Sequence, residues 1–245
     1  MPPLPSAEGK PRVIAHRGAS AYRPENTLAA FELAIEQDAD MIETDLHTTS
    51  DGVVAISHDA TLEHLGGEGE VADKTLAELQ ALDAGDGQRI PTLDEVMDRF
   101  AAQIPFNLEL KIGTGHRYEN MEQAAIDAAR SRGVMEQTLY SSFYDGVLRR
   151  LRELESSARL AVLVDYKHPE RMFERAAECS AEAINPFFSQ VDTEFMARAH
   201  GEGLAVYPYT VDDLEVMERL LDLGVDGLFT NRPDQMRELL RKRAK

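Results

Sequence analysis

The feature that most constrains the fold of this chain is a steady alternation of short apolar segments with longer amphipathic ones. Short runs of β-branched and apolar residues predict buried strands, and the segments between them have helical spacing. The predicted strands cover residues 12–16, 40–47, 105–111, 137–142, 159–164, 182–186, 203–209 and 226–230. The clearest predicted helices cover residues 120–132, 145–154, 169–179, 192–200 and 212–223. Eight such units in 245 residues match the length and rhythm of a (β/α)8 TIM barrel of the α/β class.

A doubly wound open sheet is the main rival to the barrel. Sheets of that kind that bind dinucleotides carry a Gly-x-Gly-x-x-Gly pattern directly after a strand. No predicted strand here is followed by that pattern, and no low-complexity stretch or repeat interrupts the series. We therefore expect a barrel.

One segment departs from the rhythm of strand and helix. Residues 48–104 separate the second and third predicted barrel strands and are too long for one helix. Residues 53–57 are predicted as an additional strand, reached through a turn at Ser50-Asp51-Gly52. A glycine-rich loop and a short helix over residues 75–82 follow. We expect a small insertion here that brings His58-Asp59 back toward the mouth of the barrel.

Side chains suited to phosphate chemistry gather between residues 16 and 59, near predicted strand ends. The motifs are His16-Arg17-Gly18, Glu25-Asn26-Thr27, Glu43-x-Asp45 and His58-Asp59. Because strand side chains alternate between two faces, Glu43 and Asp45 share a face. Two adjacent carboxylates repel each other unless a proton or a cation lies between them, and a divalent cation held by oxygen ligands resolves that conflict. A solvated polar strand face is the alternative for this pair taken alone.

A third carboxylate comes from the predicted strand over residues 105–111. Asn107, Glu109 and Lys111 share one face of that strand, and the two leucines between them share the other. Glu109 would complete a metal site, and Lys111 would offer a cation to a substrate phosphate. The alternative is an exposed edge strand with a Glu/Lys pair. In barrel enzymes the catalytic residues lie at the C-terminal ends of the strands. The predicted strands place His16, Asp45 and Lys111 at such ends.

In their order along the chain, these motifs resemble those of the glycerophosphodiester phosphodiesterases. The resemblance rests on AHRGAS and YRPENTLAAF within 15–31, IETDLHTTSDGVVAISHD at 42–59, DKTLAELQALDAG at 73–85, IPTLDEV at 90–96, NLELK at 107–111, YTVDD at 209–213 and DGLFTNRPD at 226–234. It covers most of the chain. It implies a TIM barrel of the bacterial cytoplasmic type, with a small insertion at the place predicted above.

The resemblance implies metal-dependent hydrolysis of glycerophosphodiesters to glycerol 3-phosphate and an alcohol. One divalent cation, Mg²⁺ or Ca²⁺, would be held by three carboxylates: Glu43, Asp45 and Glu109. His16 and His58 would divide general-base and general-acid duties, as histidines that titrate near neutrality can. The substrate would contact Arg17, Lys111 and Tyr209. The nucleophile would be the neighbouring glycerol hydroxyl, through a cyclic phosphate that water then opens, or water directly.

For several other residues the sequence indicates a place in the fold but no single role. Tyr209 either packs against the glycerol or its alcohol substituent, or is a core aromatic, and Phe143 contributes either to the mouth or to packing. His47 shares the face of the carboxylate pair and is a candidate pocket residue. Asn231 follows the last strand and is expected to cap the last helix. The remaining histidines are expected on the surface: His64, His116, His168 and His200.

Three features depart from the common pattern of the resembled family. After His58-Asp59 the chain has Glu63-His64-Leu65-Gly66 where an Arg-Thr pair is frequent, and it has no tryptophan. Asp212 stands where asparagine is common after Thr-Val. None of these positions belongs to the proposed catalytic set, so we expect them to bear on the fit of the substrate alcohol.

Composition fits a soluble enzyme with one domain over residues 11–245, after a loose tail over residues 1–10. A net charge of −18 argues against nucleic acid or an anionic membrane as the main partner. Cys179 is the only cysteine and cannot form an internal disulfide. The first ten residues lack a signal-peptide-like apolar stretch, so the cytoplasm is the expected compartment. An acidic barrel surface permits a monomer or a homodimer equally.

Two other function classes stay open beside the phosphodiesterase of deacylated phospholipids. A related barrel enzyme could act on an intact lipid, as a lysophospholipase D or a sphingomyelinase-D-like enzyme. It would need an apolar groove or a membrane-contacting loop, and the sequence shows no aromatic cluster or basic loop near the predicted mouth. A non-catalytic protein that binds glycerophosphodiesters would keep the fold, but pure binding would not need both histidines.

Overall fold

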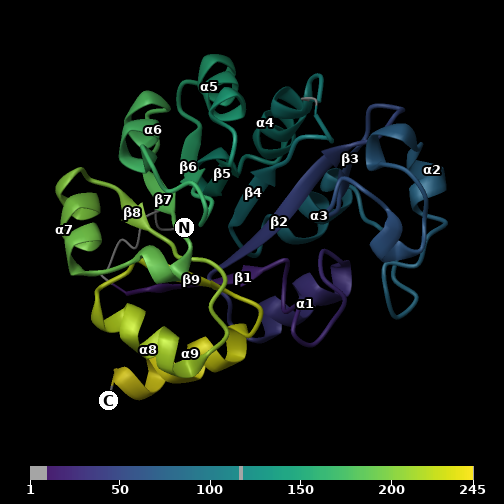
Figure 1. The fold of residues 1–245 in the computed structure, drawn as a ribbon. Helices are drawn as coiled ribbons and strands as arrows, with labels where there is room; N and C mark the ends of the chain where they lie inside the picture. Colours follow the sequence, from purple (N-terminus) through teal and green to yellow (C-terminus); the bar gives the residue numbers. More distant parts are fainter. Residues whose placement is uncertain (1–9, 116–117, 245) are drawn as a thin grey trace.

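The computed structural model describes residues 10–115 and 118–244, and its centre is a barrel of eight parallel strands surrounded by helices (Figure 1). The barrel strands are β1 (Arg12–His16), β2 (Met41–Thr48), β4 (Phe106–Leu110), β5 (Thr138–Ser142), β6 (Arg159–Leu163), β7 (Ala183–Asn185), β8 (Ala205–Val206) and β9 (Gly227–Thr230). Their order around the wall is β8-β7-β6-β5-β4-β2-β1-β9. Backbone hydrogen bonds from Asp226 to Val206 (3.1 Å) and from Phe229 to Pro208 (3.0 Å) close the wall. The predicted TIM barrel is confirmed.

A helix follows each barrel strand and packs on the outside of the wall (Figure 1). These helices are α1 (Leu28–Glu36), α3 (Leu93–Phe100), α4 (Met121–Ser131), α5 (Asp145–Leu154), α6 (Met172–Glu178), α7 (Thr193–Gly201), α8 (Leu214–Asp222) and α9 (Pro233–Arg243). The hydroxyl of Thr27 caps α1 by accepting the Ala30 N–H at 3.2 Å. The basic residues in the last turn of α9 interact favourably with the helix dipole.

Strand alternation divides the hydrophobic core into an inner and an outer part. Inside the barrel lies a small cluster of Ile14, Met41, Leu139, Ala161, Ala183, Ala205, Tyr207 and Phe229. The larger part packs between wall and helices and takes Val13 and Ala15 from β1. Because Ile14 faces inward, His16 two residues later also does, at the C-terminal end of the strand. The same rule brings polar residues of several strands to one mouth.

The insertion between β2 and α3 lies to one side of the barrel (right in Figure 1). β3 (Val54–Ile56) pairs antiparallel with β2 after a turn in which Gly52 has a φ of +82°. Two 3-10 helices (Glu63–Leu65 and Val71–Asp73) and α2 (Leu76–Leu79) then pack on a cluster of Ala55, Leu62, Val71, Leu79 and Ile90. Thr48 still belongs to β2, and α3 takes the place of the barrel helix, so the inserted elements lie well inside residues 48–104.

Two elements have half of their predicted length or less. The strand expected over residues 203–209 is only two residues long as β8. Tyr207 and Tyr209 still donate to the backbone of Ile184 and Pro186, but Pro186 and Pro208 have no N–H with which to complete the ladders. The helix expected over residues 75–82 is the single turn α2. The predicted tail over residues 1–10 lies outside the described residues except for Lys10, and His116 lies outside them too. Within the two described ranges, no helix has the length and apolar character of a membrane span.

Candidate active site

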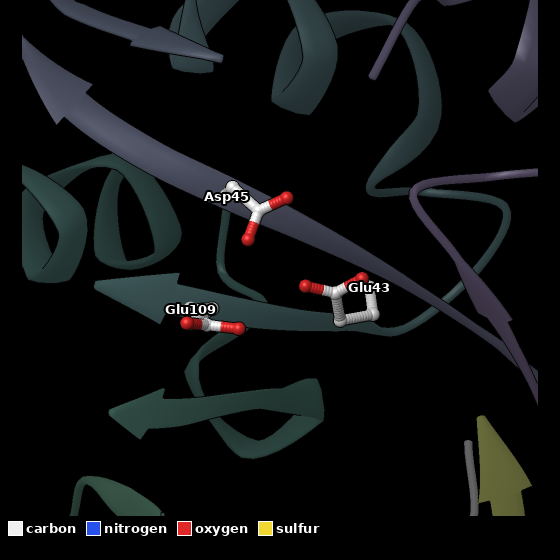
Figure 2. Close-up of side chains that lie close together, drawn as sticks. All are labelled: Glu43, Asp45 and Glu109. Atoms are coloured by element: carbon white, nitrogen blue, oxygen red, sulfur yellow. The ribbon is translucent and has the colours of Figure 1, made fainter. Parts of the chain in front are cut away.

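Three buried carboxylates meet on the adjacent strands β2 and β4, level with the C-terminal end of β1. Figure 2 shows Glu43 and Asp45 on β2 and Glu109 on the adjacent strand, where it is the register partner of Asp45. One oxygen from each carboxylate lies within 4.8 Å of the others. Glu43 Oε1 has no hydrogen-bond partner in the part of the chain that the structure describes. Crowded carboxylates with an unpartnered buried oxygen fit a divalent cation held by oxygen ligands.

Two cationic side chains, Lys111 and Arg17, form ion pairs with the three-carboxylate cluster. Lys111 Nζ lies 2.5 Å from Glu109 Oε1 and 2.9 Å from Asp45 Oδ1. Arg17 Nε lies 3.3 Å from Asp45 Oδ2, and its Nη1 lies 2.9 Å from Glu25 Oε2. When all three carboxylates are ionised, Lys111 and Arg17 do not balance their charge, and Arg17 is also shared with Glu25. The remaining negative charge is available to a metal ion.

These contacts separate the pKa values of the three carboxyls. Burial, followed by the charges of Asp45 and Glu109, raises the pKa of Glu43 well above its usual value. Burial also raises the pKa of Glu109, with Lys111 opposing. Burial acts in the same direction on Asp45, but Lys111 and Arg17 outweigh it and hold the pKa of Asp45 well below its usual range. Glu43 is therefore the carboxyl that holds a proton most readily, and a bound cation would displace that proton.

The loop after β1 fixes the carboxylates on β2 from one side. The backbone N–H of Arg17 donates to Glu43 Oε2 at 3.0 Å. Asn26, buried and with a φ of +58°, donates from its side-chain amide to Asp45 Oδ2 at 2.8 Å. Its amide oxygen accepts the Thr44 hydroxyl at 2.8 Å. The sequence pattern marked Asn26 only as the start of a helix and missed this contact.

His16 lies at the end of β1, next to Glu43 in the register of the barrel wall. Its Nδ1 atom lies 2.7 Å from Asn231 Oδ1, and Asn231 Nδ2 donates to Asp212 Oδ2 at 2.6 Å. Burial, with Arg17 adding to it, lowers the pKa of His16 to about 4. The expectation that Asn231 caps the last helix is wrong, because Arg232 is the residue that precedes α9. Asp212, which the sequence analysis left outside the proposed catalytic set, is connected through Asn231 to His16.

His58 follows β3 and is partly exposed, with its Nδ1 atom 2.7 Å from Asp59 Oδ1. Burial lowers the pKa of His58. His47, a candidate pocket residue, instead supports this loop: its Nε2 lies 3.1 Å from the His58 carbonyl oxygen and its Nδ1 lies 2.6 Å from the Tyr118 hydroxyl. His64, expected on the surface, lies 3.5 Å from Asp59. The surface expectation holds for His64, His168 and His200, which are exposed.

A cavity of about 280 Å³ opens at this mouth. Seven of the eight predicted site residues line it: His16, Arg17, Glu43, His58, Glu109, Lys111 and Tyr209. The eighth, Asp45, is buried behind them with 1% of its surface exposed. The Tyr209 hydroxyl donates to the Val164 carbonyl at 2.7 Å, so the tyrosine offers its ring to the cavity. Phe143 also lines the cavity, with its ring centroid 6.0 Å from that of Tyr209.

A second cavity of about 400 Å³ adjoins the first, and His58 lines both. It lies between the insertion and the loop that precedes α1. Its polar lining includes Glu25, Asn26, His64 and Asp83. The first cavity therefore lies beside the carboxylates, and the second lies on the other side of His58.

Aromatic side chains continue outward from the first cavity. The ring of Phe187, which lines the cavity, lies 6.0 Å from Tyr209, 5.5 Å from Tyr166 and 4.5 Å from Phe188. Tyr166 is 57% exposed. The sequence did not reveal this cluster, because its members follow three different barrel strands and meet only in the folded barrel.

Comparison with known proteins identifies the group to which this site belongs. The model of the glycerophosphoryl diester phosphodiesterase family matches residues 16–235. The chain belongs to this family. A glycerophosphodiester phosphodiesterase of Caldanaerobacter subterraneus is 36% identical over 242 residues, which cover 95% of this chain and 99% of that protein. The resemblance found in the motifs is confirmed, and with it the expected enzyme class, a phosphoric diester hydrolase.

Solved structures of family members have the same fold. An Oleispira antarctica phosphodiesterase, in complex with the product sn-glycerol-3-phosphate, has a TM-score of 0.88 and 28% sequence identity. That match covers 95% of this chain and 97% of the other. A glycerophosphodiester phosphodiesterase of Agrobacterium tumefaciens has a TM-score of 0.80 and 28% identity, with 92% and 98% covered.

Proposed function

We propose that this chain hydrolyses glycerophosphodiesters to glycerol 3-phosphate and an alcohol, with a divalent cation held by Glu43, Asp45 and Glu109. The observation that carries this function is the convergence of the carboxylates, two histidines and two cationic side chains at one mouth. The product bound to the Oleispira relative supports the same substrate class.

The metal site is proposed from the chemistry of its donors. Three buried carboxylates, one with an unpartnered oxygen, suit either Mg²⁺ or Ca²⁺, which differ in ligand number and cavity size rather than ligand type. When bound, such an ion supplies positive charge to a phosphate oxygen and orients neighbouring hydroxyls.

Arg17 and Lys111 are proposed to bind the phosphate. Arg17 is held from both sides by Asp45 and Glu25, so its planar guanidinium is oriented before substrate arrives. A planar fork of donors suits the non-bridging oxygens of a phosphodiester. The opposing charges of Asp45 and Glu109 outweigh burial and raise the pKa of Lys111, so it stays charged.

His16 and His58 are proposed to move the protons. They enter the same cavity from different elements, His16 from the end of β1 and His58 from the loop after β3. This separation lets one group accept a proton from the nucleophile while the other donates to the leaving alcohol. The nucleophile is the neighbouring glycerol hydroxyl or water.

The adjoining cavity beyond His58 is proposed to hold the departing alcohol. Its volume of about 400 Å³ and its polar lining suit a small head group. The aromatic cluster that ends at exposed Tyr166 is the one observation that favours the second candidate, an enzyme acting on an intact lipid. The cytoplasmic location, the lack of stable membrane association and the monomeric or homodimeric state stay predictions.

A substrate panel separates these candidates. Purified protein is incubated with glycerophosphocholine, glycerophosphoethanolamine, glycerophosphoglycerol and lysophosphatidylcholine, after EDTA treatment and again with Mg²⁺ or Ca²⁺ restored. Phosphorus NMR then follows the products. We expect metal-restored release of glycerol 3-phosphate from one or more of the three water-soluble diesters. Faster cleavage of lysophosphatidylcholine would favour the lipid enzyme, and cleavage of none would favour a binding protein.

A further inference from the structure

His16 stands at the end of a hydrogen-bonded series that begins on another loop. Asp212 lies between β8 and α8, and its side chain accepts three hydrogen bonds. Two come from the hydroxyl of Thr230 (3.0 Å) and the backbone N–H of Asn231 (2.8 Å), both to Oδ1. The third comes from the Asn231 side-chain amide to Oδ2, at 2.6 Å. Asp212 therefore holds both the backbone and the side chain of Asn231.

The chemistry of Asp212 decides which way the Asn231 amide points. A carboxylate only accepts hydrogen bonds, so the atom facing it at 2.6 Å is the NH2 group of Asn231. The amide oxygen then faces His16 Nδ1 at 2.7 Å. An amide oxygen only accepts, so this contact is a hydrogen bond only when Nδ1 carries the proton. The Ser20 hydroxyl lies 2.8 Å from the same oxygen and 2.7 Å from the His16 carbonyl oxygen, and its single proton can be donated to either.

We propose that Asp212 and Asn231 are positioning residues that keep the proton of neutral His16 on Nδ1 and leave the lone pair of Nε2 free on the cavity side. His16 then begins the reaction as a proton acceptor, with a ring that cannot rotate without breaking the bond to Asn231. The inference rests on the proposed function for its catalytic meaning. Its structural content, one fixed tautomer, stands independently of activity.

The Asp212 carboxylate determines which group is the donor in each hydrogen bond between His16, Asn231 and Asp212. An asparagine at this position would present an amide to the Asn231 amide, and either group could turn around. With the Asn231 amide reversed, its NH2 group would face Nδ1 and favour the proton on Nε2. An aspartate at position 212 allows only one arrangement.

Nitrogen-15 NMR of the imidazole rings tests the tautomer directly. The metal-free protein is labelled at histidine and studied at pH 8, with the His16 signals assigned through His16→Gln. We expect protonated Nδ1 and unprotonated Nε2 in the wild type, and a shift toward protonated Nε2 in Asn231→Ala. Asp212→Asn, which keeps the size of the side chain, is expected to give a mixture. Asp213→Asn changes the neighbouring carboxylate, which caps α8, and should leave the tautomer unchanged.

A proton on Nε2 in the wild type would overturn the proposal. An unchanged Nδ1 tautomer in Asn231→Ala would overturn the role of Asn231, and an unchanged tautomer in Asp212→Asn would overturn that of Asp212. In hydrolysis assays we expect Asn231→Ala to lower kcat about 100-fold with little change in KM, because the lost alignment affects proton transfer and not binding. Since wild-type activity is measured separately, a failed tautomer prediction and a failed phosphodiesterase assignment give different results.

Discussion

Asn26, in the loop between β1 and α1, donates a hydrogen bond of 2.8 Å to Asp45 Oδ2 on β2. The same amide accepts the Thr44 hydroxyl, and the two strand residues and Asn26 are buried. A buried carboxylate that also faces Lys111 and Arg17 keeps one orientation only when each oxygen has a fixed partner. The asparagine thus aligns a proposed metal ligand and is not itself one of the proposed ligands.

Asn26→Ala is expected to weaken metal binding and to lower the free energy of unfolding by about 1–3 kcal/mol. The substitution leaves a buried oxygen of Asp45 without its neutral donor, and this is the usual cost of such a loss. Calorimetric titration with Mg²⁺ or Ca²⁺ and urea denaturation measure the two effects. Thr44→Val is the control, because it removes the hydroxyl that orients Asn26 but leaves the bond from Asn26 to Asp45. Equal losses of metal affinity and stability in both variants would contradict a specific role for that bond.

Glu43→Gln is expected to stabilise the metal-free protein. We expect the variant to gain no stability when a divalent metal ion is added. Because the pKa of Glu43 is raised in the fold, the folded state holds a proton that the unfolded state has released. Stability from this group therefore falls as pH rises above about 4.5, and glutamine removes that loss. Thermal denaturation at pH 8 should show a higher Tm for the variant with EDTA, and a lower one than wild type with saturating metal.

The exposed Glu68→Gln is a suitable control for that experiment, since it changes the same charge on the surface of the insertion. A variant Glu43→Gln that melts below wild type in EDTA would show that Glu43 is not under electrostatic strain. A variant that is still stabilised by metal would show that Glu43 is not a ligand.

His47 is expected to make folding stability depend on pH between about 6.5 and 4. Burial lowers the pKa of His47 to about 4, so within that range the unfolded chain binds a proton that the folded chain does not. Stability then decreases as the pH falls, by roughly 3 kcal/mol at most for a shift of this size. Urea denaturation at pH 7 and pH 4.5 should show a smaller difference for His47→Gln than for the wild type. An equal difference in both proteins would assign the acid sensitivity to other groups.

His16→Ala and His58→Ala are each expected to lower kcat by about 10²- to 10⁴-fold, the usual contribution of a positioned acid or base. Metal affinity should change little, because neither side chain is one of the proposed ligands. His64→Ala is the matched control: this histidine lines the adjoining cavity and contacts Asp59 but has no assigned proton transfer. A loss for His64→Ala as large as for His58→Ala would show that the whole loop matters rather than one ring.

The barrel and the carboxylate cluster could be predicted from the sequence because both depend on local periodicity. Alternation along one strand puts Glu43 and Asp45 on one face, and the parallel register to the next barrel strand brings Glu109 beside them. The strand before Pro208 and the helix α2 were predicted too long, because both predictions extended the element over the whole apolar run.

The supporting contacts could not be predicted in the same way. Asn231 had a plausible local role as a helix cap, and only the closed barrel places its side chain between His16 and Asp212. His47 follows the periodicity of the carboxylate face, but its partners are the His58 backbone in the insertion and Tyr118 in the segment between β4 and α4. Contacts between loops of different strands leave no periodic signal in the sequence.

The central claim is that diester hydrolysis depends on one divalent cation held by the three carboxylates, and measuring activity against metal occupancy tests it most directly. Metal-free protein is titrated with Mg²⁺ and, separately, Ca²⁺, and bound ion and glycerol 3-phosphate release are measured in the same samples. For at least one of the two ions, we predict that activity rises in proportion to one bound ion per chain in the wild type and is lost in Glu43→Gln. Full activity in metal-free protein, or activity in Glu43→Gln equal to wild type, would contradict the account.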